Sequence, residues 1–250
     1  MTRIAVVIPC RNDAAMLQSC LALLALQDRP ADRVIVVDNA STDNTAEVCA
    51  AAGVQRILSP PPGIAPTSAR GFDAAAAAGA EILARLDADS RPPAGWLARL
   101  ETTLEEAGPL SLVTGPGDFY GASKLVCRLG RTLYLGGYFH AVGFLLGHVP
   151  VFGSNFAMTA DVWARIAPGV LRGSPLVHDD LDISYRVRPD MQVLFDAGMR
   201  MPVSARPFRS WGALWLRLSM AWETLRWEFR AEPPLRRRRE RRRRPGHQGP

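Results

Sequence analysis

Two aspartates one residue apart, Asp87 and Asp89, are the first candidates for chemistry in this sequence. They follow the mainly apolar run 81–85, which predicts a short strand. Because side chains of an extended strand alternate between its two faces, both carboxylates point the same way and can share one hard divalent cation. Phosphate oxygens and water would supply its other ligands. A lone Asp-x-Asp pair also occurs in polar loops and helix caps, so its meaning depends on the rest of the chain.

The N-terminal part of the chain predicts the elements that would position this pair. The near-continuous apolar run 4–12 is typical of a strand buried on both faces, and a helix is expected from Ala14 to Leu26. A second buried strand over 33–38 leads through Ser, Thr and Asp capping residues into a helix over about 43–52. This alternation of strands and helices predicts a parallel sheet.

Asp38 ends the second of these strands, and Asp87 and Asp89 follow the strand predicted over 81–85. In parallel α/β sheets, ligands bind in the crevice outside the carboxyl ends of the strands, so the three carboxylates are expected to gather there. Converging carboxylates repel one another unless a cation or hydrogen-bond donors lie nearby. The sequence therefore predicts an anionic, cation-holding site at this edge of the sheet.

These motifs belong to an ordered series that extends from about Thr2 to Ala197. In this order the series resembles the family 2 glycosyltransferases of the GT-A fold, although each motif alone is unspecific. The resemblance implies one α/β domain of the GT-A type, with a Rossmann-like, mostly parallel central sheet flanked by helices. The segments that carry it are 7–12 (VIPCRN), 37–45 (VDNASTDNT), 69–75 (ARGFDAA), 86–89 (LDAD), 153–158 (GSNFAM) and 178–186 (HDDLDISYR).

The resemblance implies a role for each residue of the donor side. Pro9 and Asp38 would border the nucleotide base, and Arg70 would face the donor nucleotide. Asp87 would touch the ribose or the metal shell, and Asp89 would ligate Mn²⁺ or Mg²⁺. Such a metal stabilises the negative charge of a departing nucleoside diphosphate without a proton donor.

Asp179 and Asp180 correspond to the acidic pair of that family, which is usually Glu-Asp and whose second member is the general base. Direct displacement at a sugar's anomeric carbon needs one positioned carboxylate to take the acceptor's proton, and this role falls to Asp180. Alternatively, two acids at a helix start only interact favourably with the helix dipole and have no catalytic role. The shorter Asp179 leaves the division of roles among 179, 180 and 182 open.

Three residues are expected on the acceptor side. Asn155 either shapes the acceptor site or serves the backbone as a buried amide. His178 precedes the acid pair. The segment 167–175 is rich in Gly and Pro and predicts a mobile loop that closes over the donor, with Arg172 as a phosphate contact.

The sequence departs from the family pattern at two places, and these limit what the resemblance implies. No Gln-x-x-Arg-Trp follows the acid pair, so the signature of processive polysaccharide synthases is missing and a single addition is favoured. Gly71 stands where the family usually has Asn in its Ala-Arg-Asn motif, so no role of that side chain carries over.

Length and composition favour one large unit. With 250 residues and 48% hydrophobic content, the chain can bury a substantial core. We expect a catalytic domain over 1–205, with a nucleotide-sugar-binding half at 1–115 and an acceptor-binding half at 116–205. Four scattered cysteines and the lack of a signal-peptide pattern are typical of a cytoplasmic protein in a reducing compartment.

The net charge of +6 arises in the C-terminal tail. The residues after Leu235 include eight arginines and one glutamate, so the rest of the chain is slightly acidic. Such a block predicts a disordered tail over 232–250 through self-repulsion. No aromatic residues interleave the arginines, so specific nucleic-acid binding is not expected.

An amphipathic, Trp-rich helix is predicted over 206–231. Flanking arginines would each add about 1 kcal/mol of attraction to anionic lipid, so residues 206–244 are expected to hold the chain peripherally on the inner face of the plasma membrane. Packing of the same stripe onto the catalytic domain is the alternative. The stripe consists of Trp211, Leu214, Trp215, Leu218, Trp222, Leu225 and Phe229.

The uncharged apolar run 132–148 is shorter than the roughly 20 residues of a spanning helix and contains several glycines. It predicts either a buried helix or a shelter for a lipid-like acceptor.

The sequence thus predicts an inverting, metal-dependent glycosyltransferase that moves a sugar from a nucleoside diphosphate, UDP by default, to a hydroxyl of a lipid-linked acceptor or a growing glycan. A sugar-phosphate nucleotidyltransferase is one alternative, although residues 9–13 lack its Gly-rich phosphate loop. A non-catalytic, membrane-associated nucleotide-sugar-binding module is the other.

Overall fold

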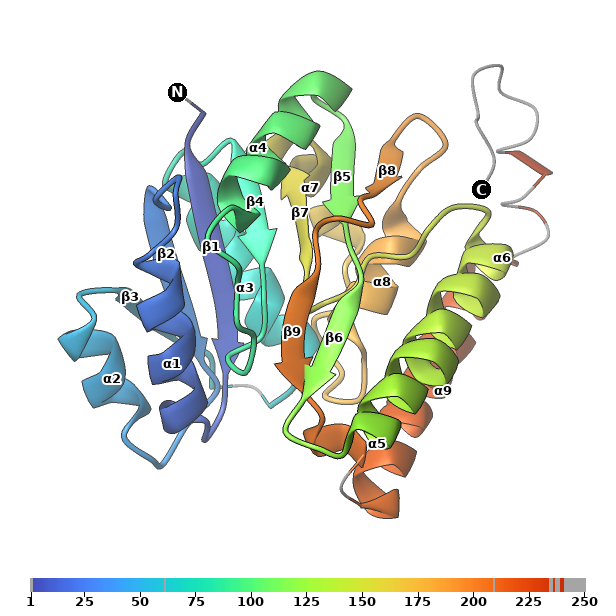
Figure 1. The fold of residues 1–250 in the computed structure, drawn as a ribbon. Coiled ribbons are helices and arrows are strands. Elements are labelled where there is room, and N and C mark those ends of the chain that lie inside the picture. The colour runs from blue at the N-terminus through green and yellow to red at the C-terminus, as the bar shows by residue number, and fades with distance from the viewer. Residues whose placement is uncertain (1, 61, 209, 234–235, 237–238, 241–250) are drawn as a thin grey trace.

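We describe the protein from a computed structural model that covers residues 2–60, 62–208, 210–233, 236 and 239–240. Its centre is a seven-stranded sheet in the order β3-β2-β1-β4-β7-β5-β8 (Figure 1). Only β7 runs antiparallel to its neighbours in this sheet, so the predicted α/β class with a mostly parallel sheet is confirmed. The strands are β1 (Ile4–Cys10), β2 (Arg33–Asp38), β3 (Gln55–Leu58), β4 (Ile82–Arg85), β5 (Ser111–Thr114), β7 (Phe156–Thr159) and β8 (Gln192–Phe195).

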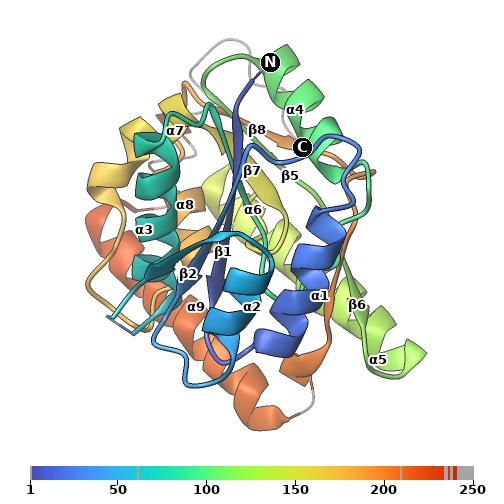
Figure 2. The ribbon, with the colours of Figure 1, turned by 90° about the vertical axis from the view of Figure 1, so that its left-hand side faces the viewer.

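Helices cover both faces of the sheet (Figure 2). On one face lie α1 (Ala14–Leu24), α2 (Thr45–Ala51) and α4 (Trp96–Ala107). The other face carries α3 (Ile64–Ala77), α7 (Ala160–Ile166) and α8 (Asp179–Arg186). Beside the main sheet, β6 (Gly117–Tyr120) and β9 (Met201–Ser204) form a separate parallel pair.

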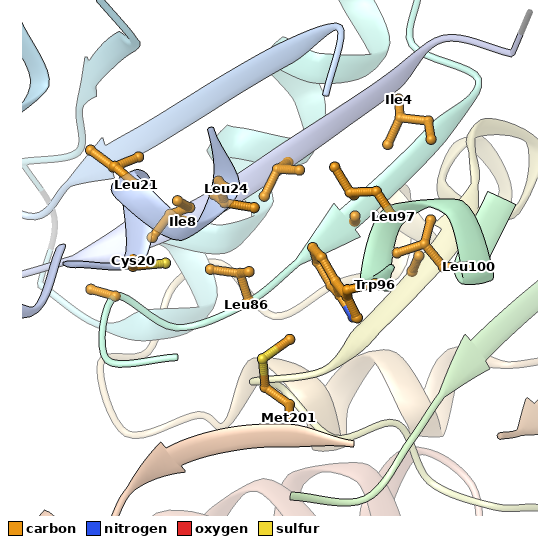
Figure 3. Packing of buried hydrophobic residues seen from close by; sticks show 14 of the residues in the cluster. Ile4, Ile8, Cys20, Leu21, Leu24, Leu86, Trp96, Leu97, Leu100 and Met201 are labelled. Carbon is orange, nitrogen blue, oxygen red and sulfur yellow. The ribbon is translucent and has the colours of Figure 1, made fainter. Parts of the chain in front are cut away.

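Strand β1 is the centre of the core and is buried along its whole length. Ile4 and Ile8 belong to the cluster beneath α1 and α4, where Leu21 and Trp96 also pack (Figure 3). The alternate residues of the strand, such as Val7, join the cluster on the α3 side. Burial on both faces explains why the strand reads as an unbroken apolar run rather than an alternating one.

Gly71 allows α3 to lie close against the sheet. A Cβ atom at this position would lie 2.3 Å from Cγ1 of Val7 and 2.8 Å from Cγ2 of Val37. Both distances are shorter than any normal contact, so even an alanine would force the helix away from β1 and β2. The departure from the family's Asn therefore has a packing reason at this position.

Residues 132–146 of the apolar run 132–148 are part of a long helical rod that starts at α5 (Lys124–Leu129) and ends at α6 (Gly143–Leu146). Two π-helical stretches, η1 (Gly130–Leu135) and η2 (Tyr138–Val142), join them. The rod is neither wholly buried nor wholly exposed: Leu135 is 3% exposed, but Leu133 is 70% exposed. Within the described residues, no helix is long and apolar enough to cross a membrane.

The C-terminal helix α9 (Trp211–Ala231) lies in the range where an amphipathic helix is expected. It packs against α8 and the short 3-10 turn η4 (Arg206–Phe208). Its inner face buries the polar Thr224 and Glu228. Trp211, Trp215 and Trp222 of the apolar stripe are 88%, 73% and 68% exposed, so these tryptophans do not pack onto the catalytic domain as core. At the C-terminal end of the stripe, the ring of Phe229 lies 6.1 Å from that of Tyr185 in α8. Most of the predicted disordered tail lies outside the described residues.

Candidate active site

A cavity of about 490 Å³ lies at the carboxyl ends of β1 and β4, the edge of the sheet that the sequence indicated. The rod between α5 and α6 contributes Tyr134 and Tyr138 to its wall, and α9 contributes Arg217 and Met220. The predicted site residues that line it are Pro9, Asp87, Asp89, His178, Asp179 and Asp180.

Asp87 follows β4 and faces two partners. Nη2 of Arg85 lies 2.9 Å from its Oδ1, and the hydroxyl of Ser154 donates to its Oδ2. Burial tends to raise the pKa of Asp87, but the charge of Arg85 and the hydrogen bond from Ser154 hold that pKa below its usual value. Asp87 is therefore ionised and fixed in place at neutral pH.

Asp89 lies next to Arg206 of η4, whose Nη2 is 3.0 Å from Oδ2 of the aspartate. The same guanidinium also binds Asp13, at 2.9 Å. Burial and then the charge of Asp87 raise the pKa of Asp89 to about 6, against the pull of Arg206. Its backbone carbonyl accepts a hydrogen bond from the hydroxyl of Tyr120 at 2.7 Å, which fixes the turn after β4.

The donor set of this site suits a hard cation that shares its coordination with a ligand. Within the described part of the chain, no group of three or more His, Cys, Asp and Glu residues is arranged to hold a metal ion by itself. Asp87 and Asp89 offer carboxylate oxygens, which Mn²⁺ and Mg²⁺ prefer, and both line the open cavity. The residues therefore fit a divalent ion that is also bound by phosphate.

The two acids at the start of α8 have different surroundings. Asp179 is 3% exposed, accepts a hydrogen bond from Oγ of Ser68 at 2.6 Å and lies 3.1 Å from Nη2 of Arg85. Asp180 accepts hydrogen bonds from the backbone N–H groups of Gly153 at 3.0 Å and of Leu181 at 2.7 Å. The side chain of Asp179 is 4% exposed and that of Asp180 is 17% exposed, so Asp180 is the more accessible of the two acids.

Burial raises the pKa of Asp180 above its usual value, and the neighbouring charge of Asp179 raises it further, while His178 and Arg85 act in the opposite direction. A carboxylate with a raised pKa is a stronger base than an ordinary one. Gly153 makes this arrangement sterically possible: a Cβ atom there would lie 2.4 Å from Nη1 of Arg85 and 3.0 Å from Oδ2 of Asp180.

Asp38 and Arg70 lie outside the residues that line the cavity. Asp38 is fully buried, accepts a hydrogen bond from the backbone N–H of Ser41 at 2.9 Å and pairs with Nε of Arg56 at 2.8 Å. These partners hold the pKa of Asp38 below its usual value, although burial acts against them. Arg70 is exposed on α3.

Asn155 and Arg172 lie outside the cavity lining as well. Asn155 is fully buried, accepts a hydrogen bond from Nε1 of Trp96 at 2.9 Å and donates to the carbonyl of Met199 at 2.6 Å. Of the two interpretations of this residue, its contacts match the buried amide that serves the backbone. Arg172 pairs with Asp73 of α3, with 3.1 Å between Nη2 and Oδ1.

His178 lies at the cavity and also touches α9. Its Nδ1 is 3.8 Å from Oδ1 of Asp180, and its Nε2 is 3.3 Å from the backbone carbonyl of Arg217. The ring therefore links the acid pair to the C-terminal helix, a connection that the sequence did not indicate.

Sequence reasoning also missed Arg85 and Arg206. Arg85 is 2% exposed at the end of β4 and joins Asp87 to Asp179. A charged residue that ends an otherwise buried strand must have a charged partner, and this signal was available in the sequence. Arg206 lies 117 residues from Asp89, and no local pattern links the two.

A mostly parallel sheet that presents Asp87 and Asp89 opposite an acidic helix start defines an α/β protein of the GT-A type. The chain belongs to glycosyl transferase family 2, because residues 5–161 match the model of that family. The resemblance that the motifs indicated is therefore confirmed.

Curated relatives are named as glycosyltransferases without an assigned reaction. Uncharacterized glycosyltransferases of Mycobacterium tuberculosis and Mycobacterium bovis are each 39% identical to this chain over 113 residues. The match covers 45% of this chain and 47% of each relative, so it spans about half the length of these proteins.

Several solved structures share the fold at low identity. The mannosyltransferase PcManGT from Pyrobaculum calidifontis, in complex with GDP-Man and Mn²⁺, is 20% identical with a TM-score of 0.65, over 96% of this chain and 68% of that one. Glucosyl-3-phosphoglycerate synthase from Mycobacterium tuberculosis, in complex with Mn²⁺, UDP and phosphoglyceric acid, has a TM-score of 0.61 at 20% identity, over 91% and 78%. S. aureus TarS with UDP-GlcNAc has a TM-score of 0.62 at 12% identity, over 92% and 73%. Identities this low establish the fold alone.

Proposed function

We propose that this protein transfers a sugar from a nucleoside diphosphate sugar to a hydroxyl acceptor by one displacement, with inversion at the anomeric carbon. The observation that carries the proposal is that one cavity holds Asp87, Asp89 and Asp180 together. Asp180 takes the proton of the acceptor hydroxyl. Asp179 pairs with Arg85 and its side chain is 4% exposed, whereas the side chain of Asp180 is 17% exposed, so Asp180 is the acid of the pair that is better placed to meet an acceptor. One base without a nucleophile favours a single displacement.

The donor binds at the carboxyl ends of β1 and β4 in this proposal. Pro9 borders the base, and Asp87 and Asp89 would hold Mn²⁺ or Mg²⁺. That ion supplies charge stabilisation to the departing diphosphate. Arg206 lines the cavity and offers the diphosphate a guanidinium, the geometry that phosphate oxygens prefer.

The remaining donor-side expectations concern residues outside the cavity lining. Asp38 fixes the turn at the end of β2 through Ser41 and Arg56. In the proposal, Asp38 stabilises the backbone next to the nucleotide base without contacting the base. Arg70 and Arg172 would have to turn toward the donor to meet its phosphates, and Arg172 would have to leave Asp73. UDP is the default nucleotide because it occurs in two of the solved relatives, and GDP and dTDP are the alternatives.

The acceptor would enter between the rod and α9. Phe119, Tyr134, Leu135 and Tyr138 line this side of the cavity, together with Met220 of α9. Apolar and aromatic walls suit a lipid-linked acceptor better than a polar glycan.

An anionic membrane surface is the proposed partner of residues 206–244. All three tryptophans of the stripe are exposed, whereas a helix that only packed inward would turn them toward the protein core. Exposed tryptophans with neighbouring arginines are typical of a helix that lies in the membrane interface. The part of this segment after residue 233 is largely outside the described residues.

A thermal-shift panel tests the donor proposal. UDP-glucose, UDP-GlcNAc, GDP-mannose and dTDP-glucose are each added with Mn²⁺ or with EDTA. A donor at 100 times its Kd should stabilise the native state by about 2.7 kcal/mol, and EDTA should abolish this gain. Asp89→Asn should lose the metal-dependent part. A panel without any metal-dependent shift would contradict the proposal.

The released product separates the proposed reaction from its alternatives. A glycosyltransferase releases a nucleoside diphosphate from the sugar nucleotide, whereas a sugar-phosphate nucleotidyltransferase releases pyrophosphate from a nucleoside triphosphate. A donor that binds but yields neither product, with polyprenyl and glycan hydroxyl acceptors present, would favour the non-catalytic binding module.

A further inference from the structure

The position of α8, which carries both acids, depends on a contact with α9. The backbone N–H of His178, the residue before α8, donates to Oγ1 of Thr224 at 2.9 Å. The hydroxyl of Thr224 donates in turn to the carbonyl of Met220 at 2.8 Å. Thr224 is fully buried although most of its helix is exposed (α8 and α9 in Figures 1 and 2).

The amide of His178 is one of the N–H groups at a helix start that have no partner within the helix. Water usually satisfies such groups, or a side chain of the same segment does so. Here the partner comes from a helix 46 residues further along the chain. A buried hydroxyl costs free energy unless it is hydrogen-bonded, and Thr is a poorer helix former than Ala. The hydrogen bond to the His178 amide therefore explains a threonine at position 224, whereas helix propensity does not.

Two further contacts join the same helices. Nε2 of His178 meets the carbonyl of Arg217 at 3.3 Å. Near the other end of α8, Arg186 pairs with Glu228 at 2.6 Å and with Asp182 at 3.0 Å. Helix α9 thus holds α8 on both sides of the turn that presents the acids to the cavity.

We propose that Thr224 is a positioning residue, whose hydroxyl fixes the His178 amide and thereby the direction in which Asp180 meets the acceptor. The inference rests on the proposed function, because it assigns Asp180 as the base. The side-chain partners of Asp87 are Arg85 and Ser154, and that of Asp89 is Arg206, all outside α9, so donor binding should not depend on the hydroxyl of Thr224. Misplacement of a reacting group by about 1 Å lowers rates by roughly 100-fold. Loss of the hydroxyl therefore lowers the rate of transfer and leaves nucleotide affinity unchanged.

The test compares Thr224→Val, which keeps the shape, with Thr224→Ser, which keeps the hydroxyl. Thr102→Val is the matched control, because Thr102 makes the same bond to the carbonyl four residues earlier, at 3.1 Å, on the exposed side of α4. The Kd of UDP and of GDP, each with Mn²⁺, is measured by calorimetry, and kcat is measured with the sugar nucleotide that the thermal-shift panel selects. Val at 224 should lower kcat by about 10- to 100-fold at unchanged Kd, and Ser should restore it.

The outcomes are distinct. If the wild-type protein transfers sugar and Thr224→Val is equally fast, the inference is overturned and the proposed function stands. A Ser variant as slow as the Val variant, or a Val variant that loses nucleotide affinity in parallel with kcat, also overturns it, because Thr224 then has only a structural role. A wild-type protein that transfers nothing from any donor removes the proposed function and this inference with it.

Discussion

Nη2 of Arg85 lies 3.1 Å from Oδ2 of Asp179, and this pair joins the end of β4 to the first turn of α8. The same guanidinium nitrogen lies 2.9 Å from Oδ1 of Asp87. One buried cation therefore links the proposed donor side of the cavity to the proposed acceptor side. The two halves of the site cannot shift independently while this guanidinium is in place.

Replacing Arg85 by Met should destabilise the protein by about 3–5 kcal/mol, because the buried Asp179 would lose the cation that compensates its charge and the half-buried Asp87 would lose its ion pair. Urea unfolding measures this loss. Arg99→Met serves as the control, because Arg99 forms an exposed pair with Asp196 and should cost about 1 kcal/mol or less. A similar loss of unfolding free energy in both variants would contradict the prediction that the buried ion pairs of Arg85 contribute more than an exposed pair.

Asp180→Asn should abolish transfer while donor binding persists. Removal of a general base lowers rates by about 10²–10⁴-fold. The single amide oxygen can keep one of the two hydrogen bonds that the carboxylate accepts from backbone N–H groups, that from Gly153, and the side chain keeps its size. Asp190→Asn, at an exposed ion pair with Arg165, is the control and should remain fully active. Unchanged turnover of the Asp180 variant would falsify the assignment of the base.

The activity should rise with pH as Asp180 loses its proton, because only the carboxylate accepts the acceptor's proton. Burial and the charge of Asp179 raise the pKa of Asp180, so the midpoint of this limb should lie above the ordinary value of 3.8. A pH profile of kcat at saturating donor measures the midpoint. An acidic limb centred at 3.8 or lower contradicts the expected environment of this group.

The raised pKa of Asp180 also determines how the free energy of unfolding changes with pH. The folded state binds the proton of Asp180 more tightly than the unfolded state does. The stabilisation from this proton is complete below the unfolded pKa and is lost as the pH rises through the folded pKa. Asp180→Asn should therefore gain stability relative to the wild-type protein as the pH increases, which urea unfolding at several pH values can measure.

Sedimentation with vesicles tests the outer face of α9. Replacing Trp211, Trp215 and Trp222 with Ser should reduce binding to vesicles that contain anionic lipid, since these three side chains are among the most exposed apolar groups of the chain. Leu26→Ser together with Leu58→Ser removes exposed apolar side chains outside α9 and should leave binding unchanged. If wild-type protein and tryptophan variant partition equally, the helix serves another purpose.

The sequence predicted those parts of the protein that depend on local pattern. The unbroken apolar run of β1 and the capping residues before α2 depend only on neighbours in the chain, and both elements form where expected. Asp87 and Asp89 both line the cavity, but they lie after β4 has ended at Arg85, so alternation along a strand does not account for their placement. The partition of the domain into two halves stays a prediction.

Contacts between distant segments were beyond this reasoning. The pairing of Arg206 with Asp89 and of Ser68 with Asp179 joins residues more than 100 positions apart, without a periodic signal. The stripe on α9 shows a related limit, because periodicity identifies an apolar face but does not say whether that face meets protein or the exterior. The orientation follows from contacts of the inner face with α8, among them those of the buried Thr224 and Glu228.

The close approach of α3 to the sheet at Gly71 also restricts how this sequence can change. Val7 and Val37 fill the space that a side chain at 71 would need, so an asparagine there requires a smaller residue at one or both valines beforehand. Each of those intermediate steps opens a hole in the core and weakens the fold. Stepwise mutation of this chain toward the Asn-bearing motif of its family therefore passes through variants with a lower free energy of unfolding. The packing of Val7 and Val37 thus disfavours replacement of Gly71, whatever the role of the glycine itself.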